Sequence, residues 1–577
     1  MESIPHLFVA AIDLGTTYSG VGFSSRNSFT KDPTNVSLKS WHGTMVTSKA
    51  PTAVLFHHQK FSSFGYEAEE KYTELLLDGE AEGWNFFTKF KMTLYEQQTS
   101  LDALELEAEN GNKMSALTVF SAAIRYLWEQ IMNEIVKQVS YVTREDIKWV
   151  ITVPAIWTQP AKSFMRKAAI IAGLDSKMLT IALEPEVAAI FLKHLPLEKK
   201  KFGEIGDTFR AFSPGSKYII VDVGGGTMDI TTHEVLEDGS VKELIQSSGG
   251  DWGGTNVDDN IMEFFEDLLG SKTMSTLRTD HQLDFLELKR NIETAKLSIS
   301  TQYKRKMTII IPAVLRDLFK KHHDGMELTS VKSAKLREGK TVDISLSSGK
   351  LKLDYEIACS FFESVINSIC SHLKHIFQQC SEFRVDIMIM VGGFANSSIL
   401  SRGVLNEFPD KYVIVPEHAG WSVLKGAVIF GHDPQLIKER RSRYTYGVKC
   451  KQLFKDSIHD PAKRLEENGK VFCRDLFSKH VKINELITVG EYQTKKKYRI
   501  SQDATSKLEL YASRDPDPKY VSDEGCFKIG ELKLSSPDLE VGSKSCVQLS
   551  FSQTEIEAKM VHLKTGETTV LYLETNF

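Results

Sequence analysis

The spacing of hydrophobic residues predicts alternating strands and helices over residues 1–431. Continuous apolar runs bounded by turn residues predict buried strands, whereas an apolar residue every three or four positions predicts an amphipathic helix. The expected strands lie within residues 7–23, 147–155 and 217–230. The expected helices are residues 114–138, 162–174 and 186–195, and a polar segment follows at 196–216. Alternation of this kind indicates an α/β architecture.

The pattern changes after residue 431. Residues 432–446 are polar and basic, which predicts a linker with a solvated face, although contact with a partner is an alternative. The positively charged residues of this stretch include Lys438, Arg440, Arg441 and Arg443. Beyond it helical periodicity is scarce, residues 547–552 alternate between apolar and polar, and residues 564–567 predict a turn. We therefore expect an α/β part at 1–431, a linker at 432–446 and a β-rich domain at 447–577.

Two similar glycine-containing segments divide the α/β part. IDLGTT at 12–17 and VDVGGGT at 221–227 each lie at the end of an apolar run that predicts a strand. A segment that recurs in this way indicates a duplicated unit. We therefore expect two α/β lobes that face each other across a cleft, with one such segment in each lobe.

Composition and charge narrow the classes of partner. The formal net charge of -5 gives no general attraction to nucleic acid or to an anionic membrane. The seven cysteines are scattered without a CxxC pair, which argues against a zinc site and favours reduced thiols. No run reaches the roughly 18 apolar residues of a membrane-spanning helix, and the first residues lack the basic start of a signal peptide. We expect a cytoplasmic protein without a membrane span.

The two glycine-containing segments carry chemistry that binds phosphate. Glycine lets backbone N–H groups approach an anion closely, because it has no side chain and tolerates positive φ. Asp13 and Asp222 stand at the ends of the two predicted strands, where carboxylates can hold a hydrated Mg²⁺ ion beside a polyphosphate. An ordinary tight turn is the alternative for either segment alone. Both together, in this order, favour binding of a magnesium–nucleotide complex.

The order of several short segments resembles the actin, hexokinase and heat-shock ATPase superfamily. These segments are AIDLGTTYSGVGF, ITVPA, LEPEVAAI, VDVGGGTMDI, ETAKLSIS, MVGGF and GAVIFG. IDLGTTYS, ITVPA and GGGTxD are specifically similar to the 70-kDa heat-shock proteins, and the resemblance covers about residues 7–431. FTKFKM at 87–92 and RRSRYTYGV at 440–448 point to a divergent branch of that family. The resemblance implies the actin-like ATPase fold, with two duplicated α/β lobes around a nucleotide cleft.

The resemblance also implies ligands and residue roles. ATP or ADP is the expected nucleotide, and Asp13 and Asp222 are expected to hold Mg²⁺ through water. Catalytic roles are implied for Lys91, Glu184, Thr227 and Asp229. Nucleotide contacts are implied for Gly15, Thr16, Thr17, Tyr18, Gly224, Gly225, Gly226, Thr227, Gly253, Gly254, Glu293, Lys296, Ser300, Gly392, Gly393 and Phe394.

Several of these assignments have alternatives. Lys89 is a rival to Lys91 for the lysine that contacts the γ-phosphate, and Lys91 could instead be an ordinary solvated lysine. Glu184 could cap the helix that follows it. Asp229 could lie on the surface of its strand. Trp252 either lines the nucleoside pocket or packs beside its neighbouring glycines.

The residues expected around adenosine depart from the family. Glu293, Lys296 and Ser300 are spaced to share one helix face, which in the family contacts ribose and base. Leu297 and Asn396 stand where the family usually has arginines, one of which stacks on adenine. We therefore expect base contacts that differ from those of other family members.

The part beyond the linker resembles the peptide-binding β-sandwich of the family, while the family's helical lid and acidic co-chaperone tail have no counterpart. The polar linker offers little apolar area for docking, so we expect weak coupling between the ATPase lobes and the β domain. The sequence thus predicts a chaperone-like protein that hydrolyses ATP slowly with Mg²⁺ and binds a protein partner or client through its β domain. An adaptor that binds nucleotide with little hydrolysis is the alternative, and a sugar kinase is less favoured.

Overall fold

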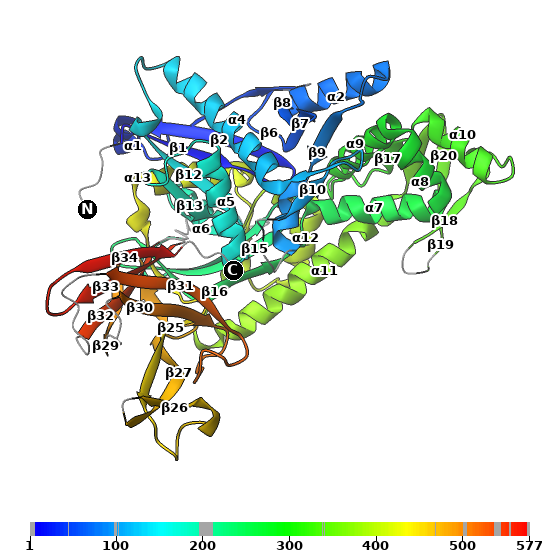
Figure 1. The fold of residues 1–577 in the computed structure, drawn as a ribbon. Helices are drawn as coiled ribbons and strands as arrows, with labels where there is room; N and C mark the ends of the chain where they lie inside the picture. Colours follow the sequence, from blue (N-terminus) through cyan, green and yellow to red (C-terminus); the bar gives the residue numbers. More distant parts are fainter. Residues whose placement is uncertain are drawn as a thin grey trace.

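Two α/β lobes and a C-terminal region of strands make up the chain (Figure 1). The computed structural model describes residues 6–43, 46–96, 101, 103–195, 212–336, 339, 341–467, 469–499, 505–535, 544–552 and 555–573. Most of the polar segment expected at 196–216 therefore lies outside the described residues.

The first lobe is built on a sheet that begins with the first predicted strand. Its main strands are β1 (Phe8–Asp13), β2 (Tyr18–Ser25), β3 (Ser37–Leu38), β12 (Ile147–Val153) and β13 (Leu179–Leu183). They run in the order β13-β12-β1-β2-β3, with β1 antiparallel to β2 and parallel to β12. The predicted helices α4 (Ala116–Val136) and α5 (Gln159–Ile171) bury their apolar faces in the same hydrophobic core as this sheet.

The second lobe repeats this arrangement. Its corresponding strands are β14 (Lys217–Val223), β15 (Met228–Val235), β16 (Val241–Gly250), β22 (Ile387–Val391) and β23 (Tyr412–Ile414). They run in the order β23-β22-β14-β15-β16, with β14 antiparallel to β15 and parallel to β22. Strand order and direction therefore match the first lobe, which confirms the duplication predicted from the two glycine-containing segments.

Two helices lie between the lobes and join their cores. α6 (Glu184–Leu192) and α13 (Ser422–His432) share a hydrophobic cluster with residues of β1 and of β14. A Cβ atom on Gly426 of α13 would stand 1.7 Å from the carbonyl oxygen of Val187, so only glycine allows this close packing. The lobes are thus held together along one side, where α6 and α13 meet.

Each lobe carries an outer part that closes over the cleft. In the first lobe it contains α2 (Tyr66–Asp78) and the small sheet of β7 (Ala53–His57), β8 (Lys60–Phe64) and β9 (Trp84–Thr88). In the second lobe it contains α7 (Gly254–Leu269), α8 (Ser271–Asp280), α9 (Gln282–Ser298) and α10 (Ala313–His322). The long α11 (Tyr355–Gln379) runs beneath the second lobe and shares its core (Figure 1).

The C-terminal region is dominated by two antiparallel sheets. One contains β26 (Arg464–Glu467), β27 (Lys470–Val481), β25 (Thr445–Leu453), β30 (Thr505–Ser513) and β31 (Cys526–Ser535). The other contains β29 (Tyr492–Arg499), β32 (Lys544–Ser552), β33 (Glu555–His562) and β34 (Thr568–Leu573). Both sheets contribute to one core cluster, which includes Val448, Leu510, Val547 and Met560. The strands predicted from the alternation at 547–552 and the turn at 564–567 are present as β32 and β34.

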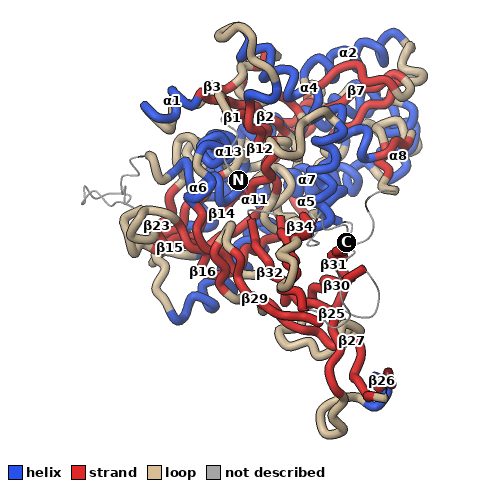
Figure 2. The backbone as a smooth tube through the Cα atoms, turned by 60° about the vertical axis from the view of Figure 1, so that its left-hand side comes forward, coloured by secondary structure: helices blue, strands red, loops and turns tan. Residues whose placement is uncertain are grey.

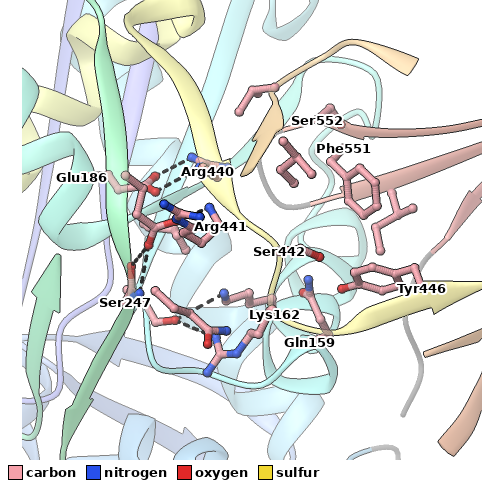
Figure 3. Close-up of a pocket in the computed structure, with 18 residues that line it drawn as sticks. Gln159, Lys162, Glu186, Ser247, Arg440, Arg441, Ser442, Tyr446, Phe551 and Ser552 are labelled. Carbon is pink, nitrogen blue, oxygen red and sulfur yellow. Dashed lines mark hydrogen bonds and ion pairs between the residues drawn. The ribbon is translucent and has the colours of Figure 1, made fainter. Parts of the chain in front are cut away.

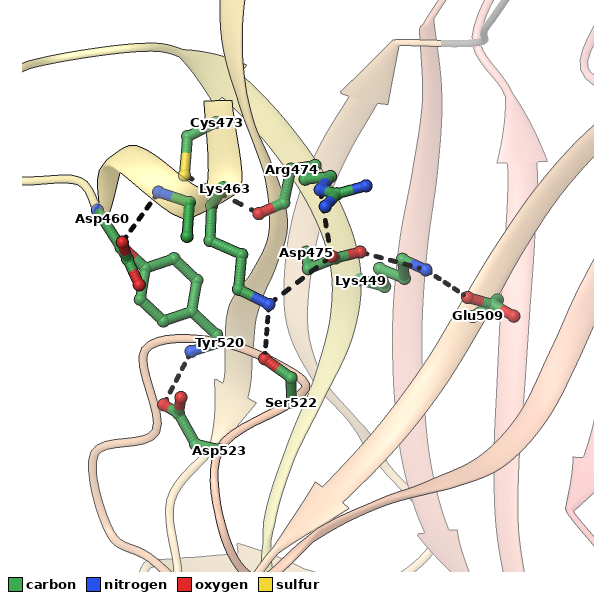
Figure 4. A network of polar contacts seen from close by, with 11 residues as sticks. Lys449, Asp460, Lys463, Cys473, Arg474, Asp475, Glu509, Tyr520, Ser522 and Asp523 are labelled. Atoms are coloured by element: carbon green, nitrogen blue, oxygen red, sulfur yellow. Dashed lines mark hydrogen bonds and ion pairs between the residues drawn. The ribbon is translucent and has the colours of Figure 1, made fainter. Parts of the chain in front are cut away.

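The hairpin of β26 and β27 projects away from both lobes (Figure 2). A charged network fixes its base (Figure 4). Asp475 of β27 lies 3.2 Å from the Lys449 ammonium of β25 and 3.7 Å from that of Lys463. Lys449 also lies 3.1 Å from Glu509 of β30, so the network ties three strands together.

The stretch 432–446 is not a solvated linker, and that prediction is wrong. α13 continues to His432, and β24 (Ile437–Arg441) then pairs in parallel with β16 and antiparallel with β28 (Leu486–Thr488). The sheet of the second lobe thus has seven strands, and its last strand comes from the C-terminal region. Strand pairing and buried ionic contacts attach the C-terminal region to the lobes, so this attachment does not depend on an apolar linker.

Candidate nucleotide site

The two glycine-containing turns lie against each other at the bottom of the cleft. A Cβ atom on Gly225 would stand 2.5 Å from the hydroxyl oxygen of Thr17, and one on Gly226 would stand 2.7 Å from that of Thr16. Glycine is therefore required for this approach. Glycine-containing turns in such close approach are typical of sites that bind an anion such as a phosphate chain.

The N-terminus of α7 rests on the second turn. The backbone N–H of Gly254 donates to the carbonyl of Gly224 at 3.1 Å, and that of Thr255 donates to Gly225 at 2.8 Å. Gly253 also approaches this turn closely. The predicted residues Gly253 and Gly254 therefore lie beside the phosphate turn, where the partial positive charge of a helix N-terminus favours an anion.

Four carboxylates, three of them buried, and two lysines lie beside these turns. We call this set the cleft cluster, and its members are Asp13, Lys49, Lys91, Glu184, Asp222 and Asp229. Lys49 lies 2.7 Å from Asp13, and Lys91 lies 2.7 Å from Glu184. Acids outnumber bases by two, so the cluster carries an excess of negative charge that a divalent cation would balance.

The excess of acid changes the protonation of the cluster. Burial raises the pKa of Asp222 well above its ordinary value, and the neighbouring charges of Glu184, Asp229 and Asp13 raise it further. Burial also raises the pKa of Glu184 to about 7, although the Lys91 ammonium opposes the shift. These carboxyl groups are thus poised to lose protons when a cation enters.

Asp13 behaves differently from its neighbours. Burial alone would raise its pKa, but the charges of Lys49 and Lys91 hold it below its ordinary value. Both of its oxygens are occupied, because Lys49 donates to Oδ2 at 2.7 Å and the Thr152 hydroxyl donates to Oδ1 at 3.0 Å. Asp13 therefore stays ionised while already carrying a positive partner.

Lys91, and not its rival Lys89, belongs to the cleft cluster. Lys91 is 3% exposed, and its ammonium lies over the Trp157 ring at 5.4 Å from the centroid. Lys89 instead lies 3.6 Å from Asp258 and is more exposed. The alternative that Lys91 is a solvated lysine is wrong.

The alternatives for the two acids also fail. Glu184 begins α6 but makes no side-chain cap, and its carboxylate turns to Lys91. Asp229 is buried, so it is not a surface residue of its strand. It accepts a hydrogen bond from the backbone N–H of Ile156 at 2.9 Å. The second turn thus places both Thr227 and Asp229 inside the cleft, next to the first lobe.

On the adenosine side, the structure separates residues that were expected on one helix face. The Tyr18 hydroxyl donates to Glu293 of α9 at 3.3 Å, across the cleft between the lobes. Lys296 points elsewhere, into a buried ion pair of 2.7 Å with Asp258. Ser300 lies beyond the end of α9, which stops at Ser298, so the prediction that it shares the helix face is wrong.

Some of the remaining residues predicted near adenosine pack in the core of the second lobe instead. Phe394 belongs to the core of the second lobe and packs beside Gly254, whereas Leu297 is 72% exposed and stacks on nothing. Trp252 packs against that core and against His372, which favours the packing alternative. Gly392 lies directly against Asp222, because a Cβ there would stand 2.4 Å from its Oδ1.

The carboxylates of the cleft cluster are the groups of this site that could hold Mg²⁺. Among the described residues, no group of three or more His, Cys, Asp or Glu side chains is placed to hold a metal ion directly. Asp222 accepts no hydrogen bond from the described residues and lies among three other carboxylates. A buried carboxylate of this kind suits Mg²⁺ held through water, which is how this ion usually binds. The residues therefore fit a hydrated ion on the Asp222 side of the cluster.

Two functional residues escaped sequence reasoning. Lys49 enters the cleft cluster from an irregular stretch between β5 (Val46–Thr47) and β6 (Ala50–Pro51), and no motif surrounds it. Thr52 braces the first turn, because its hydroxyl donates to the Gly15 carbonyl at 2.8 Å. The one sequence feature near Lys49 and Thr52 is Pro51, which restricts the backbone at the end of the short strand β6.

The fold and the site together define a nucleotide-binding protein of the actin-like ATPase class. The family model described as Hsp70 protein matches residues 9–338. Heat shock 70 kDa protein 12A of Mus musculus and that of Homo sapiens are each 32% identical over 98% of this chain and 91% of their own length. Heat shock 70 kDa protein 12B of Homo sapiens is 29% identical over 97% of this chain and 89% of its own. The chain belongs to the Hsp70 family, as the sequence motifs predicted.

Membrane insertion through a helix finds no support in the described residues. None of their helices combines the length and the apolar character needed to cross a bilayer.

Proposed function

We propose that this chain binds ATP with Mg²⁺ in the cleft, hydrolyses it slowly and acts as a chaperone-like protein through its C-terminal region. The observation that carries the proposal is the cleft cluster, in which four carboxylates, three of them buried, and two lysines lie beside two phosphate-type turns. Buried carboxyl groups in excess of their cationic partners destabilise the fold when they ionise, so their presence favours the binding of a cation. Membership of the Hsp70 family supports ATP as the ligand.

The residues of the cluster divide the work of hydrolysis. The amides of the two turns bind phosphate oxygens, and the Lys91 ammonium neutralises charge that moves onto the γ-phosphate as the bond breaks. Glu184 and Asp229 hold the attacking water, and Glu184 can take its proton because the pKa of this carboxyl is raised to about 7. Mg²⁺, held through water beside Asp222, supplies charge neutralisation for the phosphate chain.

A second candidate function is an adaptor that binds nucleotide with little turnover. Lys49 favours it, because this lysine already occupies the Asp13 oxygen that would otherwise face a hydrated metal. Leu297 adds to it, because an exposed leucine offers adenine less than the stacking arginine of the family. As an adaptor, the protein would use bound nucleotide to hold the lobes in one conformation, and its C-terminal region would bind a dedicated protein partner.

The projecting hairpin of β26 and β27, together with the end of β25 and the loop that leads into β26, is our candidate for the partner surface. It stands clear of both lobes in Figures 1 and 2. Leu453 at the end of β25 and Ile458 in the following loop are both exposed large hydrophobic residues. Exposed apolar side chains on a projecting element are typical of contacts with another protein. The seven free cysteines support a reducing compartment such as the cytoplasm.

Single-turnover hydrolysis separates the two functions. We expect the full chain to release phosphate from ATP slowly, in a reaction that needs Mg²⁺ and is lost in Asp222→Asn. Asp238→Asn is the matched control, because Asp238 is an acid of the same lobe that pairs with Lys438 at the surface. Tight ATP binding without hydrolysis would favour the adaptor. Absence of both binding and hydrolysis would contradict the assignment of the site.

A further inference from the structure

A second polar cavity lies outside the nucleotide cleft, where both lobes meet the C-terminal region (Figure 3). Its volume is about 100 Å³, and its walls come from α5, β16, β24 and β28, with β32 and β33 closing the far side. A buried water needs roughly 10–15 Å³ of such space. The cavity therefore has room for several water molecules or for one small polyatomic ion.

Ionic side chains line this cavity in unequal numbers. We call them the junction cluster, and its members are Lys162, Glu186, Glu243, Arg440, Arg441 and Arg443. Glu186 is matched by Arg440, whose Nε donates to its Oε1 at 2.9 Å and whose second nitrogen binds its other oxygen. Glu243 accepts from the Ser247 backbone and hydroxyl and from the Arg441 backbone N–H. Both carboxylates are thus fully engaged.

Three cations of the junction cluster form no ion pair with a carboxylate of the described residues. The Arg443 guanidinium donates to the backbone carbonyls of residues 155–157 at 3.0–3.1 Å. The Arg441 guanidinium donates to the carbonyls of Leu244 and Asn484. Carbonyl dipoles satisfy these donors but leave their charge in place. The cluster therefore holds an excess of positive charge around an open space.

Lys162 is the least satisfied of these cations. It is 7% exposed, and within the described residues its ammonium makes one hydrogen bond, at 3.5 Å to the Ala155 carbonyl. A buried ammonium without an ion pair is costly. Burial and the nearby Arg443 charge lower the pKa of Lys162 to about 7, although the charges of Glu186 and Asp229 oppose the shift. The side chain lies on the cavity wall, so an anion in the cavity would supply the missing charge.

We propose that this cavity binds a small oxyanion of the phosphate class, with Lys162 as its central contact. A phosphate ion accepts hydrogen bonds on each oxygen, and the wall offers the Lys162 ammonium, the Gln159 amide and the Tyr446 hydroxyl as donors. Gln159 and Lys162 belong to α5 of the first lobe, whereas Tyr446 begins the C-terminal sheet. The bound ion therefore fastens the C-terminal region to the lobes.

Inorganic phosphate is the probe for this site. The nucleotide-free full chain is titrated with sodium phosphate, against sodium chloride of equal ionic strength, by thermal unfolding and by calorimetry. We expect a saturable rise of Tm and heat of binding in the wild type. Lys162→Met should weaken phosphate binding on the order of tenfold or more, because one charge-assisted contact is lost. Without phosphate the same variant should have a higher Tm than the wild type, because it removes an unbalanced buried charge.

Matched variants separate this cavity from the cleft, which also binds phosphate under the proposed function. Lys91→Met removes a lysine of the cleft cluster, and Lys148→Met removes a half-buried lysine of β12 outside both clusters. Lys148→Met should keep the whole phosphate response of the wild type, and Lys91→Met should keep the part of the response that Lys162→Met loses. A response that is lost in Lys91→Met and kept in Lys162→Met would place the ion in the cleft and overturn the proposal. So would a wild type that does not respond, or a Lys162→Met protein with a strongly lowered Tm in chloride.

Hydrogen exchange of the wild type tests the site without any variant. Phosphate should slow exchange at residues 155–162 and 442–446, because both segments contribute to the lining of the cavity. Slowing confined to the glycine-containing turns at 13–17 and 222–227 would refute binding at the junction.

Discussion

The cleft cluster and the junction cluster are two buried sets of charge with opposite excess. The first has four acids and two bases, and the second has four bases and two acids. In the cleft cluster each lysine is paired with a carboxylate, whereas in the junction cluster Glu186 is paired with Arg440 and Glu243 is held by a hydroxyl and by backbone N–H groups. A buried set with matched charges is complete in itself, whereas an unmatched set is completed by a ligand of the opposite sign. The comparison indicates a metal–nucleotide complex in one place and an anion in the other.

Ile156 touches both clusters. Its backbone N–H donates to Asp229 of the cleft cluster, and its carbonyl accepts from Arg443 of the junction cluster. This contact physically joins the cleft cluster to the C-terminal region. Weak coupling between the ATPase lobes and the C-terminal region stays a prediction, and the contact is the place at which to test it.

The largest effect should follow from breaking the matched pair of the junction cluster. Arg440→Met leaves the Glu186 carboxylate buried and unpaired, so the free energy of unfolding should fall by about 3–5 kcal/mol. Urea denaturation measures the loss. Lys438→Met is the control, because its ion pair with Asp238 is exposed and screened by water, so its loss should change the free energy of unfolding far less. Adding Glu186→Gln to Arg440→Met should restore part of the loss, and no recovery would contradict the pairing.

The next effect concerns the minority charge of the cleft cluster. Lys91→Met should slow hydrolysis by about 100- to 1000-fold while changing ATP affinity much less, because the ammonium matters most in the transition state. Single-turnover kinetics and equilibrium binding measure the two quantities separately. Lys89→Met should leave the rate nearly unchanged, since Lys89 pairs with Asp258 outside the cluster. A slower Lys89 variant with an unaffected Lys91 variant would reverse the assignment.

The acid excess of the cleft cluster should appear in the pH dependence of stability. The pKa of Glu184 is raised to about 7 from an ordinary 4.5, so the folded protein holds this proton more tightly than the unfolded chain. Its stabilisation is complete below pH 4.5 and is lost as pH rises to about 7, at no more than about 1.4 kcal/mol per pH unit. Urea denaturation without metal or nucleotide should show this decline, and Glu184→Gln should flatten it. An equally steep decline in the variant would mean that other groups cause it.

The smallest expected effect concerns Lys49. It shows whether the positive charge of this lysine replaces part of the charge that Mg²⁺ would supply. Lys49→Met should increase the dependence of ATP affinity on Mg²⁺ by roughly tenfold, mostly by weakening binding in EDTA. Titration with and without Mg²⁺ gives the ratio. Lys39→Met provides the control, because this half-buried lysine of the same lobe pairs with Glu134 instead. An unchanged ratio would show that Lys49 only neutralises Asp13 in the empty site.

The sequence predicted the parts of this protein that obey local rules. β1 and β14 follow from apolar runs, and the turns after them follow from glycines that approach a neighbouring backbone. The helix α4 follows from its apolar spacing, within two residues at each end. The same rules failed for Ser300, because the helical spacing was continued past the point where α9 ends.

Long-range partners account for the other failures. The charged residues of β24 predict a solvated stretch. The sequence around them does not show that Arg440 forms a buried ion pair with Glu186, which lies far away in the chain. Lys49 was missed for the same reason, because its partner Asp13 is reached only through the folded lobe. Charged residues can thus lie in the core. Their burial can be predicted only when the position of the oppositely charged partner is known.

The edge strands of the second lobe have a consequence for how this protein is made. β16 stays an open edge until β24 is synthesised, and β24 stays open until β28 emerges still later in the chain. At about 5–20 residues per second, the growing chain carries an unpaired strand edge for on the order of ten seconds or more. Unpaired edges are templates for aggregation. During its own translation this chain therefore passes through a state with an exposed strand edge, which is closed only when β28 has been made.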